Sequence, residues 1–134
     1  MPGKKGLSEN IKVVSVVDRV LEHARIFHFQ HGGDDLVYIS SADWMGRNLD
    51  RRVELMVPVE SADCKSRLMK IVKAYFDDNT NAMELQSSGE YELVVKKKKK
   101  AIFRSQEHLY EEVSRVHGAR TNPRTTVFEP HRGT

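Results

Sequence analysis

Residues 23–54, HARIFHFQHGGDDLVYISSADWMGRNLDRRVE, decide how this chain is interpreted, because they join strand-like runs to a dense set of polar side chains. The run 25–30 alternates between apolar and polar residues, and the run 36–40, LVYIS, is rich in β-branched and aromatic residues. Each run predicts a strand. Gly32 and Gly33 between them can supply the positive φ angles of a tight turn, so the stretch predicts a β-hairpin.

Further strands flank this hairpin on both sides. Residues 41–50 predict a loop or a single helical turn, and residues 52–59 predict a strand. The preceding run 11–17, IKVVSVV, is apolar on both faces, which is typical of a buried, parallel strand. Asp18 can cap a short helical turn that ends near His23.

Two helices are predicted in the second half of the chain. Ser61 has the character of an N-cap, and Ser105 is expected to cap a last helix that stops at Gly118. Apolar residues recur at helical spacing in both segments and predict buried faces. These residues are Leu68, Ile71, Val72, Tyr75 and Phe76 in the first helix, and Leu109, Val113 and Val116 in the second.

The remaining segments are expected to be peripheral. Residues 83–85 and 91–95 predict short edge strands, and the five lysines at 96–100 predict a solvated loop. Residues 1–10 are expected to be a flexible lead-in and residues 119–134 a disordered tail. The elements together predict the α/β class, with a mixed sheet and flanking helices.

Composition narrows the possible functions. A chain of 134 residues fits one domain with one core. The net charge of +3 does not by itself indicate nucleic acid, and we predict no nucleic-acid partner. A lone cysteine, Cys64, allows no internal disulfide and agrees with the reducing cytoplasm. Neither a secretory signal nor a membrane-spanning apolar run is visible, so we expect a cytoplasmic protein, with membrane association as part of a longer protein left open.

The polar side chains of the central stretch are predicted to meet. His23 and Arg25 are two residues apart and would share a face of an extended strand. If the predicted strands are neighbours, the residues that precede one strand and follow the next converge at one end of the sheet. The candidate site residues are His23, Arg25, Ser41, Asp43, Arg47, Arg52 and Glu54.

These residue types suit phosphoryl transfer. Guanidinium groups bind phosphate oxygens in pairs and offset the charge of the transition state. A neutral imidazole, here that of His23, can attack phosphorus or move a proton. Asp43 and Glu54 would orient the histidine and the arginines. Because no C-x-x-C or H-x-x-x-H spacing occurs, we predict no protein-held metal site.

The same residues resemble a known family. The pattern H-x-R, S-S-x-D and R-N-x-x-x-R-x-E is similar to the signature of the phospholipase D superfamily, whose usual form is H-x-K, G-S-x-N and then an arginine and a glutamate. Arg25 stands in place of the lysine, Ser40 of the glycine and Asp43 of the asparagine. Within the superfamily, SENIKVVSVVDRVLEHARIFHF, VYISSADWMGRNLDRRVEL and FRSQEHLYEE resemble the last part of the C-terminal catalytic domain of bacterial polyphosphate kinases.

The resemblance implies that residues 11–118 are a C-terminal, partial phospholipase D-like catalytic subdomain. The implied reaction is reversible transfer of the ATP γ-phosphate to a polyphosphate chain, with Mg²⁺ carried by ATP. In the family, the histidine that becomes phosphorylated normally belongs to the first of two halves that face one tunnel. His23 matches the second-half histidine at the nucleotide and phosphate end, where Arg25, Ser41, Arg47 and Arg52 would bind phosphate.

The implied partners are ATP or ADP, inorganic polyphosphate, and the remaining polyphosphate kinase domains or another half-site. Since the opposing half is missing, the resemblance also implies that this chain is inactive alone. Two other functions are considered beside it. One is a non-catalytic module that binds polyanions through its arginines and the lysines at 96–100. The other is a phosphodiesterase completed by dimerisation, although Arg25 and Asp43 argue against it.

Structural explanations exist for several of these residues. Ser41 and Asp43 would also suit the capping of the turn that follows them. Arg52 and Glu54 share a predicted strand face, so a simple ion pair between them would also explain both residues. Trp44 is expected to fill the core rather than to stack on a base.

Overall fold

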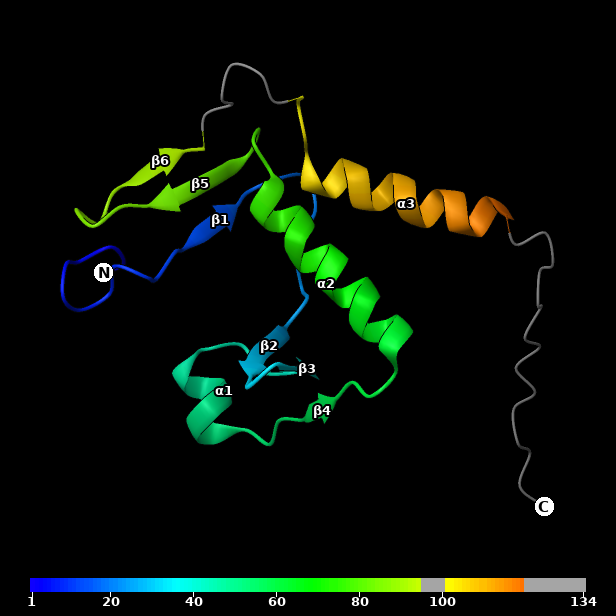
Figure 1. Cartoon of the computed structure of the whole chain (residues 1–134), viewed down its shortest axis with the longest axis horizontal. Coiled ribbons are helices and arrows are strands. Elements are labelled where there is room, and N and C mark those ends of the chain that lie inside the picture. Colours follow the sequence, from blue (N-terminus) through cyan, green and yellow to red (C-terminus); the bar gives the residue numbers. More distant parts are fainter. Residues whose placement is uncertain (95–100, 120–134) are drawn as a thin grey trace.

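The computed structural model describes residues 1–94 and 101–119. Its strands form two three-stranded sheets, in the orders β1-β5-β6 and β2-β3-β4, and every strand pairing among the described residues is antiparallel (Figure 1). The elements in chain order are β1 (Val14–Val16), β2 (Ile26–His31), β3 (Asp34–Ser40), α1 (Gly46–Arg51), β4 (Met56–Pro58), α2 (Ala62–Asp77), β5 (Ala82–Leu85), β6 (Tyr91–Leu93) and α3 (Ser105–Ala119).

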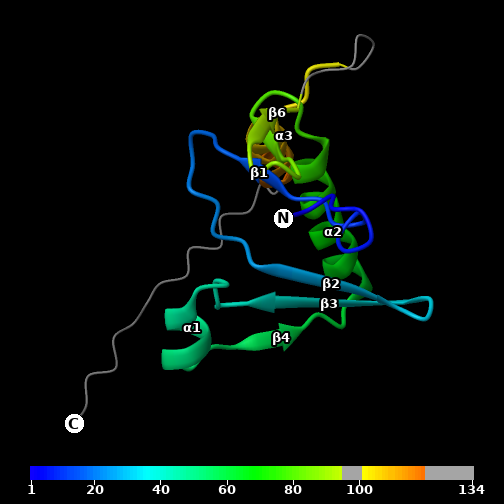
Figure 2. The ribbon, with the colours of Figure 1, turned by 90° about the vertical axis from the view of Figure 1, so that its left-hand side faces the viewer.

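Helix α2 links the two sheets. It starts after β4 of the second sheet and ends just before β5 of the first, so the sheets lie at opposite ends of this helix (Figure 1). The view turned by 90° about the vertical axis shows β2, β3 and β4 as one layer beside the lower part of α2 (Figure 2). Helix α3 starts near the first sheet and packs against α2. The α/β class predicted from the sequence is therefore confirmed.

The central hairpin forms as predicted. Strands β2 and β3 pair from Ile26 opposite Ile39 to His31 opposite Asp34. Gly32 and Gly33 occupy the connecting loop with φ angles of 59° and 108°. A side chain disfavours this left-handed backbone, which explains why the turn contains two glycines.

The predicted single mixed sheet is wrong. Strand β1 pairs with β5 in the antiparallel direction, with Val14 opposite Glu84, and it belongs to a sheet separate from that of the hairpin. It is also an outer strand of that sheet and only half-buried. An apolar run predicts that both faces of a strand are buried, but it does not determine whether the partner strand is parallel or antiparallel.

The predicted helical turn over residues 18–23 is also wrong, because residues 17–25 have no regular secondary structure. Asp18 does not act as a helix cap. Its carboxylate accepts a hydrogen bond from Arg104 Nε at 2.8 Å and pairs with Arg104 Nη2 as well. The hydrogen bonds from Arg104 hold the pKa of Asp18 well below its ordinary value. A contact across the fold therefore replaces the local cap.

Helix α2 follows the sequence prediction at its start. Ser61 Oγ accepts a hydrogen bond from Cys64 N at 3.4 Å, so the predicted N-cap is confirmed. The stripe of α2 is only partly buried, since Phe76 is exposed. Strand β4 is shorter than the predicted 52–59. Helix α3 continues through Gly118 to Ala119 instead of stopping at Gly118.

Ser105 is the first residue of α3, and the cap of this helix comes from another element. Asp78, which follows α2, accepts hydrogen bonds from Ser105 N and Ser105 Oγ, both at 2.8 Å, through Oδ2. Through Oδ1 it accepts from the backbone of Thr80, Asn81 and Ala82. One buried carboxylate thus fixes the end of α2, the start of β5 and the start of α3.

Residues 1–10 form hydrogen-bonded turns, with Ser8 Oγ donating to the Met1 carbonyl at 2.7 Å. The lysine run at 96–100 and the predicted tail from residue 120 onward lie outside the described residues.

The core is small for a chain of this length. Among the described residues, the buried apolar side chains are those of Val37, Ala42, Ala74 and Ala82. Val37 and Ala42 belong to the second sheet and the loop after it, whereas Ala74 and Ala82 lie near Asp78. The buried apolar side chains therefore lie in two separate groups. Polar contacts such as those of Asp78 connect the helices and strands around them.

We predict that Asp78→Ala lowers the free energy of unfolding by about 3 kcal/mol, because the buried backbone donors it serves lose their acceptor. Urea denaturation at pH 7 measures this change. Glu92→Ala on the exposed strand β6 is the matched control and should change the free energy of unfolding by less than about 0.5 kcal/mol. Equal losses in the two variants would contradict the role given to Asp78.

The contribution of Asp78 should also depend on pH. Burial raises the pKa of Asp78, but hydrogen bonds from Ser105, Asn81 and Thr80 outweigh burial, so its pKa lies below the ordinary value. A carboxylate with a lowered folded-state pKa contributes its full stabilisation above the unfolded pKa of about 3.9. This stabilisation is lost as the pH falls through the folded-state pKa. The stability difference between the parent chain and Asp78→Asn should therefore be constant from about pH 7 to 5 and shrink below about pH 4. Urea titrations at several pH values test this, and a difference that grows on acidification would refute it.

Candidate functional site

The antiparallel pairing of the second sheet gathers the candidate residues. The start of β2 lies beside the end of β3, where Ser40 N donates to the Arg25 carbonyl at 2.9 Å. The end of β3 lies beside the start of β4, where Ser41 N donates to the Leu55 carbonyl at 3.0 Å. The segments before β2, after β3 and before β4 therefore meet at one end of the sheet. The predicted convergence is confirmed, and its geometry is that of neighbouring antiparallel strands.

His23 and Arg25 form the first part of this cluster. Arg25 Nη1 lies 3.2 Å from His23 Nδ1, and Arg25 Nη2 lies 3.2 Å from His23 Nε2. A neutral imidazole has a single acceptor nitrogen, and its two nitrogens point in diverging directions, so one guanidinium cannot hydrogen-bond both. The paired distances instead indicate that the guanidinium stacks on the ring. Arg25 Nη1 also donates to the His23 carbonyl at 3.3 Å.

Asp43 pairs with the same guanidinium. Arg25 Nε donates to Asp43 Oδ1 at 2.6 Å, with side chains that are 15% and 36% exposed. This hydrogen bond, together with the charges of Arg25 and Arg47, holds the pKa of Asp43 below its ordinary value. The same bond raises the pKa of Arg25. Asp43 therefore orients Arg25, and it makes no described hydrogen bond to the imidazole of His23.

Ser41 and Glu54 form the second part. Ser41 Oγ donates to Glu54 Oε2 at 2.5 Å and accepts from Leu55 N at 3.0 Å. Arg52 Nε lies 3.5 Å from Glu54 Oε1, but this oxygen is buried and has no hydrogen bond, so the contact with Arg52 is an ion pair only. Glu54 holds the hydroxyl of Ser41 and the charge of Arg52 in place. It also lies near enough to Arg25 to raise the pKa of that guanidinium.

Arg47 joins the cluster through charge rather than contact. It is exposed in the first turn of α1, and its charge contributes to the lowered pKa of Asp43. The structure thus brings together all the predicted site residues in two adjacent groups. The first is His23, Arg25 and Asp43, with Arg47 close by, and the second is Ser41, Glu54 and Arg52.

The prediction that Trp44 fills the core is wrong. Its side chain is 81% exposed, and its ring stacks on that of Phe27 with centroids 6.2 Å apart. Trp44 directly follows Asp43, so the turn that carries the carboxylate to Arg25 directs the next side chain over the surface of β2. Large aromatic side chains are usually buried, and the prediction for Trp44 rested on this general behaviour.

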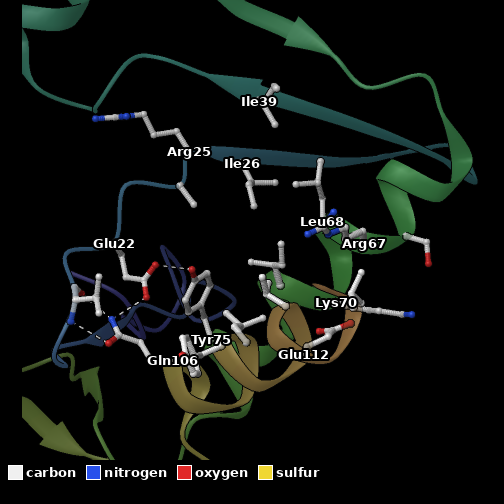
Figure 3. A pocket seen from close by; sticks show the side chains of 18 of the residues that line it. Glu22, Arg25, Ile26, Ile39, Arg67, Leu68, Lys70, Tyr75, Gln106 and Glu112 are labelled. Atoms are coloured by element: carbon white, nitrogen blue, oxygen red, sulfur yellow. Dashed lines mark hydrogen bonds between the residues drawn. The ribbon is translucent and has the colours of Figure 1, made fainter. Parts of the chain in front are cut away.

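Sequence reasoning missed a second polar network, in which Glu22 contacts both α2 and α3. Tyr75 Oη donates to Glu22 Oε2 at 2.6 Å, and Gln106 Nε2 donates to Glu22 Oε1 at 2.8 Å (Figure 3). Gln106 also bonds both backbone groups of Val20. Burial, together with the neighbouring carboxylate of Glu22, raises the pKa of Tyr75.

This network and the contact between Asp18 and Arg104 position the segment before β2. They tie residues 18–22 to the start of α3, and the next residues carry His23 and Arg25. The segment FRSQEH, in which Arg104 and Gln106 lie, was part of the family resemblance. That match was the available signal, although it gave no role to either side chain.

Within residues 1–94 and 101–119, no group of three or more histidine, cysteine, aspartate or glutamate side chains is placed to hold a metal ion. The described helices include none that is long and apolar enough to cross a membrane.

Comparisons with known proteins give a consistent result. The family model "Polyphosphate kinase C-terminal domain 2" matches residues 1–106. The chain is 50% identical over 131 residues to the polyphosphate kinase of Rhodopirellula baltica, covering 98% of this chain and 15% of that protein. It is 54% identical over 90 residues to the polyphosphate kinase of Synechocystis sp., covering 67% of this chain and 12% of that protein.

A solved structure agrees with these sequence matches. The crystal structure of polyphosphate kinase from Porphyromonas gingivalis superposes with a TM-score of 0.76 at 34% identity, over 84% of this chain and 17% of that chain. The match confirms the predicted phospholipase D-like fold. The coverage of 12% to 17% shows that this chain spans only a small part of the length of each of these proteins.

The position of Trp44 leads to a spectroscopic prediction. As the only tryptophan of the chain, it should emit at the wavelength of a solvent-exposed indole and be quenched by iodide almost as readily as in the denatured chain. Steady-state fluorescence with a quencher titration measures this. Leu36→Trp in a Trp44→Phe background is the reference, since Leu36 is only 38% exposed. Blue-shifted, protected emission from Trp44 would contradict the described geometry.

Proposed function

Because the chain belongs to the polyphosphate kinase family, as its C-terminal domain, we propose that it supplies one half of the nucleotide and phosphate site of an ATP–polyphosphate phosphotransferase. The observation that carries the proposal is the unit of His23, Arg25 and Asp43, in which a guanidinium contacts both an imidazole and a carboxylate. The substrates are ATP or ADP and inorganic polyphosphate.

The proposed roles follow from the contacts. Asp43 and the ring of His23 hold the guanidinium of Arg25 in one orientation, while some of its N–H groups stay available to phosphate oxygens. A guanidinium fixed before the substrate arrives binds and stabilises developing charge without reorganising. His23 is exposed beside it and is assigned to proton transfer or attack at the phosphate.

The remaining residues extend this phosphate surface. Arg47, near Asp43, and Arg52, beside Glu54, are both exposed and would bind further phosphates of the nucleotide or of the polyphosphate chain. The hydroxyl of Ser41 already donates to Glu54, so it would meet a phosphate only through exchange of that bond. Glu54 is assigned to hold Ser41 and Arg52, and Asp43 to hold Arg25.

Mg²⁺ is proposed to arrive with ATP. The nearest carboxylates, those of Asp43 and Glu54, are engaged with Arg25 and with Ser41 and Arg52, and so do not form an open cluster of oxygen ligands. The ion would be held mainly by phosphate oxygens and would neutralise part of their charge. The residues of this chain would then orient the phosphates on which the ion sits.

The half-site needs a second half to complete the reaction. The chain spans about 15% of the length of its Rhodopirellula baltica relative, so we propose that it is inactive alone and works with the remaining polyphosphate kinase domains in the cytoplasm. A module that only binds polyanions stays the alternative, together with a phosphodiesterase formed by dimerisation. The binding affinities of the Arg25→Ala and His23→Ala variants separate the first alternative from the proposal.

We predict that Arg25→Ala weakens binding of Mg-ATP and of polyphosphate about 10- to 100-fold, the loss expected for charge-assisted hydrogen bonds. His23→Ala should weaken it as well, although less than Arg25→Ala. Isothermal titration calorimetry of the purified chain at low and high salt measures both effects.

The control is Lys12→Ala, which removes the same charge from the first sheet, where Lys12 pairs with Glu84 at 3.0 Å. It should leave binding within about twofold of the parent chain. Binding that falls equally in all three variants, and that vanishes with salt, would identify a nonspecific basic surface instead.

A further inference from the structure

His23 lies in a segment without regular secondary structure, so side-chain contacts on both sides of it fix its position. Residues 17–25 form neither helix nor strand, and His23 itself is exposed. On the C-terminal side, the guanidinium of Arg25 is fixed by its hydrogen bond to Asp43. On the N-terminal side, the nearest anchor is Glu22, the residue directly before the histidine, which contacts both α2 and α3.

The side-chain amide of Gln106 is the centre of the N-terminal anchor (Figure 3). Gln106 Oε1 accepts a hydrogen bond from Val20 N at 3.0 Å, and Gln106 Nε2 donates to the Val20 carbonyl at 2.6 Å. The side chain thus pairs with both backbone groups of one residue, as a neighbouring antiparallel strand would. The same nitrogen donates to Glu22 Oε1 at 2.8 Å.

These bonds match the donors and the acceptor of a glutamine. The amide nitrogen carries two N–H groups, and its two acceptors are the Val20 carbonyl and the carboxylate of Glu22. The amide oxygen accepts from the backbone of the same valine. A glutamate has no donor when it is ionised, and an asparagine is one methylene shorter. Gln106 is therefore the residue type that this arrangement requires.

The start of α3 gives Gln106 a fixed place in the fold. The residue before it, Ser105, donates two hydrogen bonds of 2.8 Å to the buried carboxylate of Asp78. The residue before that, Arg104, pairs with Asp18. Three consecutive residues at the start of one helix therefore bind three separate positions of the chain.

Glu22 is held from two helices at once. Tyr75 Oη from α2 donates to Glu22 Oε2 at 2.6 Å, while Gln106 from α3 donates to Glu22 Oε1. A carboxylate bonded through both oxygens has little freedom to rotate. The backbone at Glu22 is thus fixed relative to α2 and α3, and His23 is held between two anchored residues, Glu22 and Arg25.

We propose that Gln106 is a positioning residue of the phosphate site, which acts through Val20 and Glu22 and sets where the imidazole of His23 lies against Arg25. The proposal rests on the proposed function, since it concerns the group assigned there to proton transfer or attack at the phosphate. Such placement matters because a displacement of about 1 Å can lower a rate about 100-fold.

Amide hydrogen exchange of the purified chain, followed by NMR, tests whether Gln106 anchors the segment. Gln106→Ala should speed exchange of the Val20 amide at least about fivefold, because this amide loses its acceptor. The amides of the hairpin β2–β3 should exchange within about twofold of their rates in the parent chain. Gln30→Ala, which removes an exposed amide side chain from β2, is the matched control and should leave Val20 unchanged.

Two results of this measurement would overturn the proposal. One is an unchanged exchange rate of Val20 in Gln106→Ala. The other is faster exchange throughout the hairpin as well, which would identify a general loss of stability. Gln106→Glu keeps the length of the side chain but has no donor when ionised, so it should release the segment as Gln106→Ala does.

A binding cycle tests whether the anchor acts through His23. Isothermal titration calorimetry with Mg-ATP is run on the parent chain, Gln106→Ala, His23→Ala and the double variant. Gln106→Ala should weaken binding about three- to tenfold in the parent, and less than about twofold when His23 is already replaced by alanine. An equal loss in both backgrounds would overturn the proposal, because Gln106 would then affect binding by another route.

The two measurements distinguish this proposal from the proposed function. Binding that does not depend on His23, with faster exchange of Val20 in Gln106→Ala, would remove the proposed function and leave only the anchoring of the segment. Binding that depends on His23, with unchanged exchange, would keep the proposed function and remove the role of Gln106.

Discussion

The register of the second sheet is the constraint on which the candidate site depends. Pairing Ile26 with Ile39 and Ser40 with Met56 fixes which chain ends face each other. A slip of one residue would turn the side chains of a whole strand to the opposite face, so it would separate Arg25 from Asp43. The turn at Gly32 and Gly33 holds this register, although it lies at the far end of the hairpin from the cluster.

The hairpin was predictable because its signals are local. Alternation, β-branched residues and paired glycines act within a few residues, and the convergence of the site follows once neighbouring strands are assumed. The partner of β1 was not predictable in the same way. It depends on β5, roughly seventy residues later in the chain, and no local pattern states the direction of such a pairing.

Polar contacts between distant segments were the other gap. The caps expected from Asp18 and Ser105 were assigned by proximity, but their partners are Arg104 and Asp78, which lie on distant segments of the chain. Trp44 was placed in the core by the usual behaviour of its residue type. Tertiary contacts outweigh local preference in deciding the partners and the burial of these side chains. The apolar stripe of α3 was likewise predicted to be buried from its spacing, but Val113 and Val116 are exposed.

The contact between Arg25 and Asp43 has a consequence for how the two side chains depend on each other. Both positions depart from the usual superfamily pattern, which has a lysine and an asparagine there, and here the two departures bond to each other. An ammonium is a compact charge without a flat face, so it would not stack on the ring of His23 while donating to the carboxylate. An asparagine would leave the charge of the guanidinium without its partner. A change at either position alone would therefore remove the contact, so the two residues act as one unit in holding the guanidinium in place.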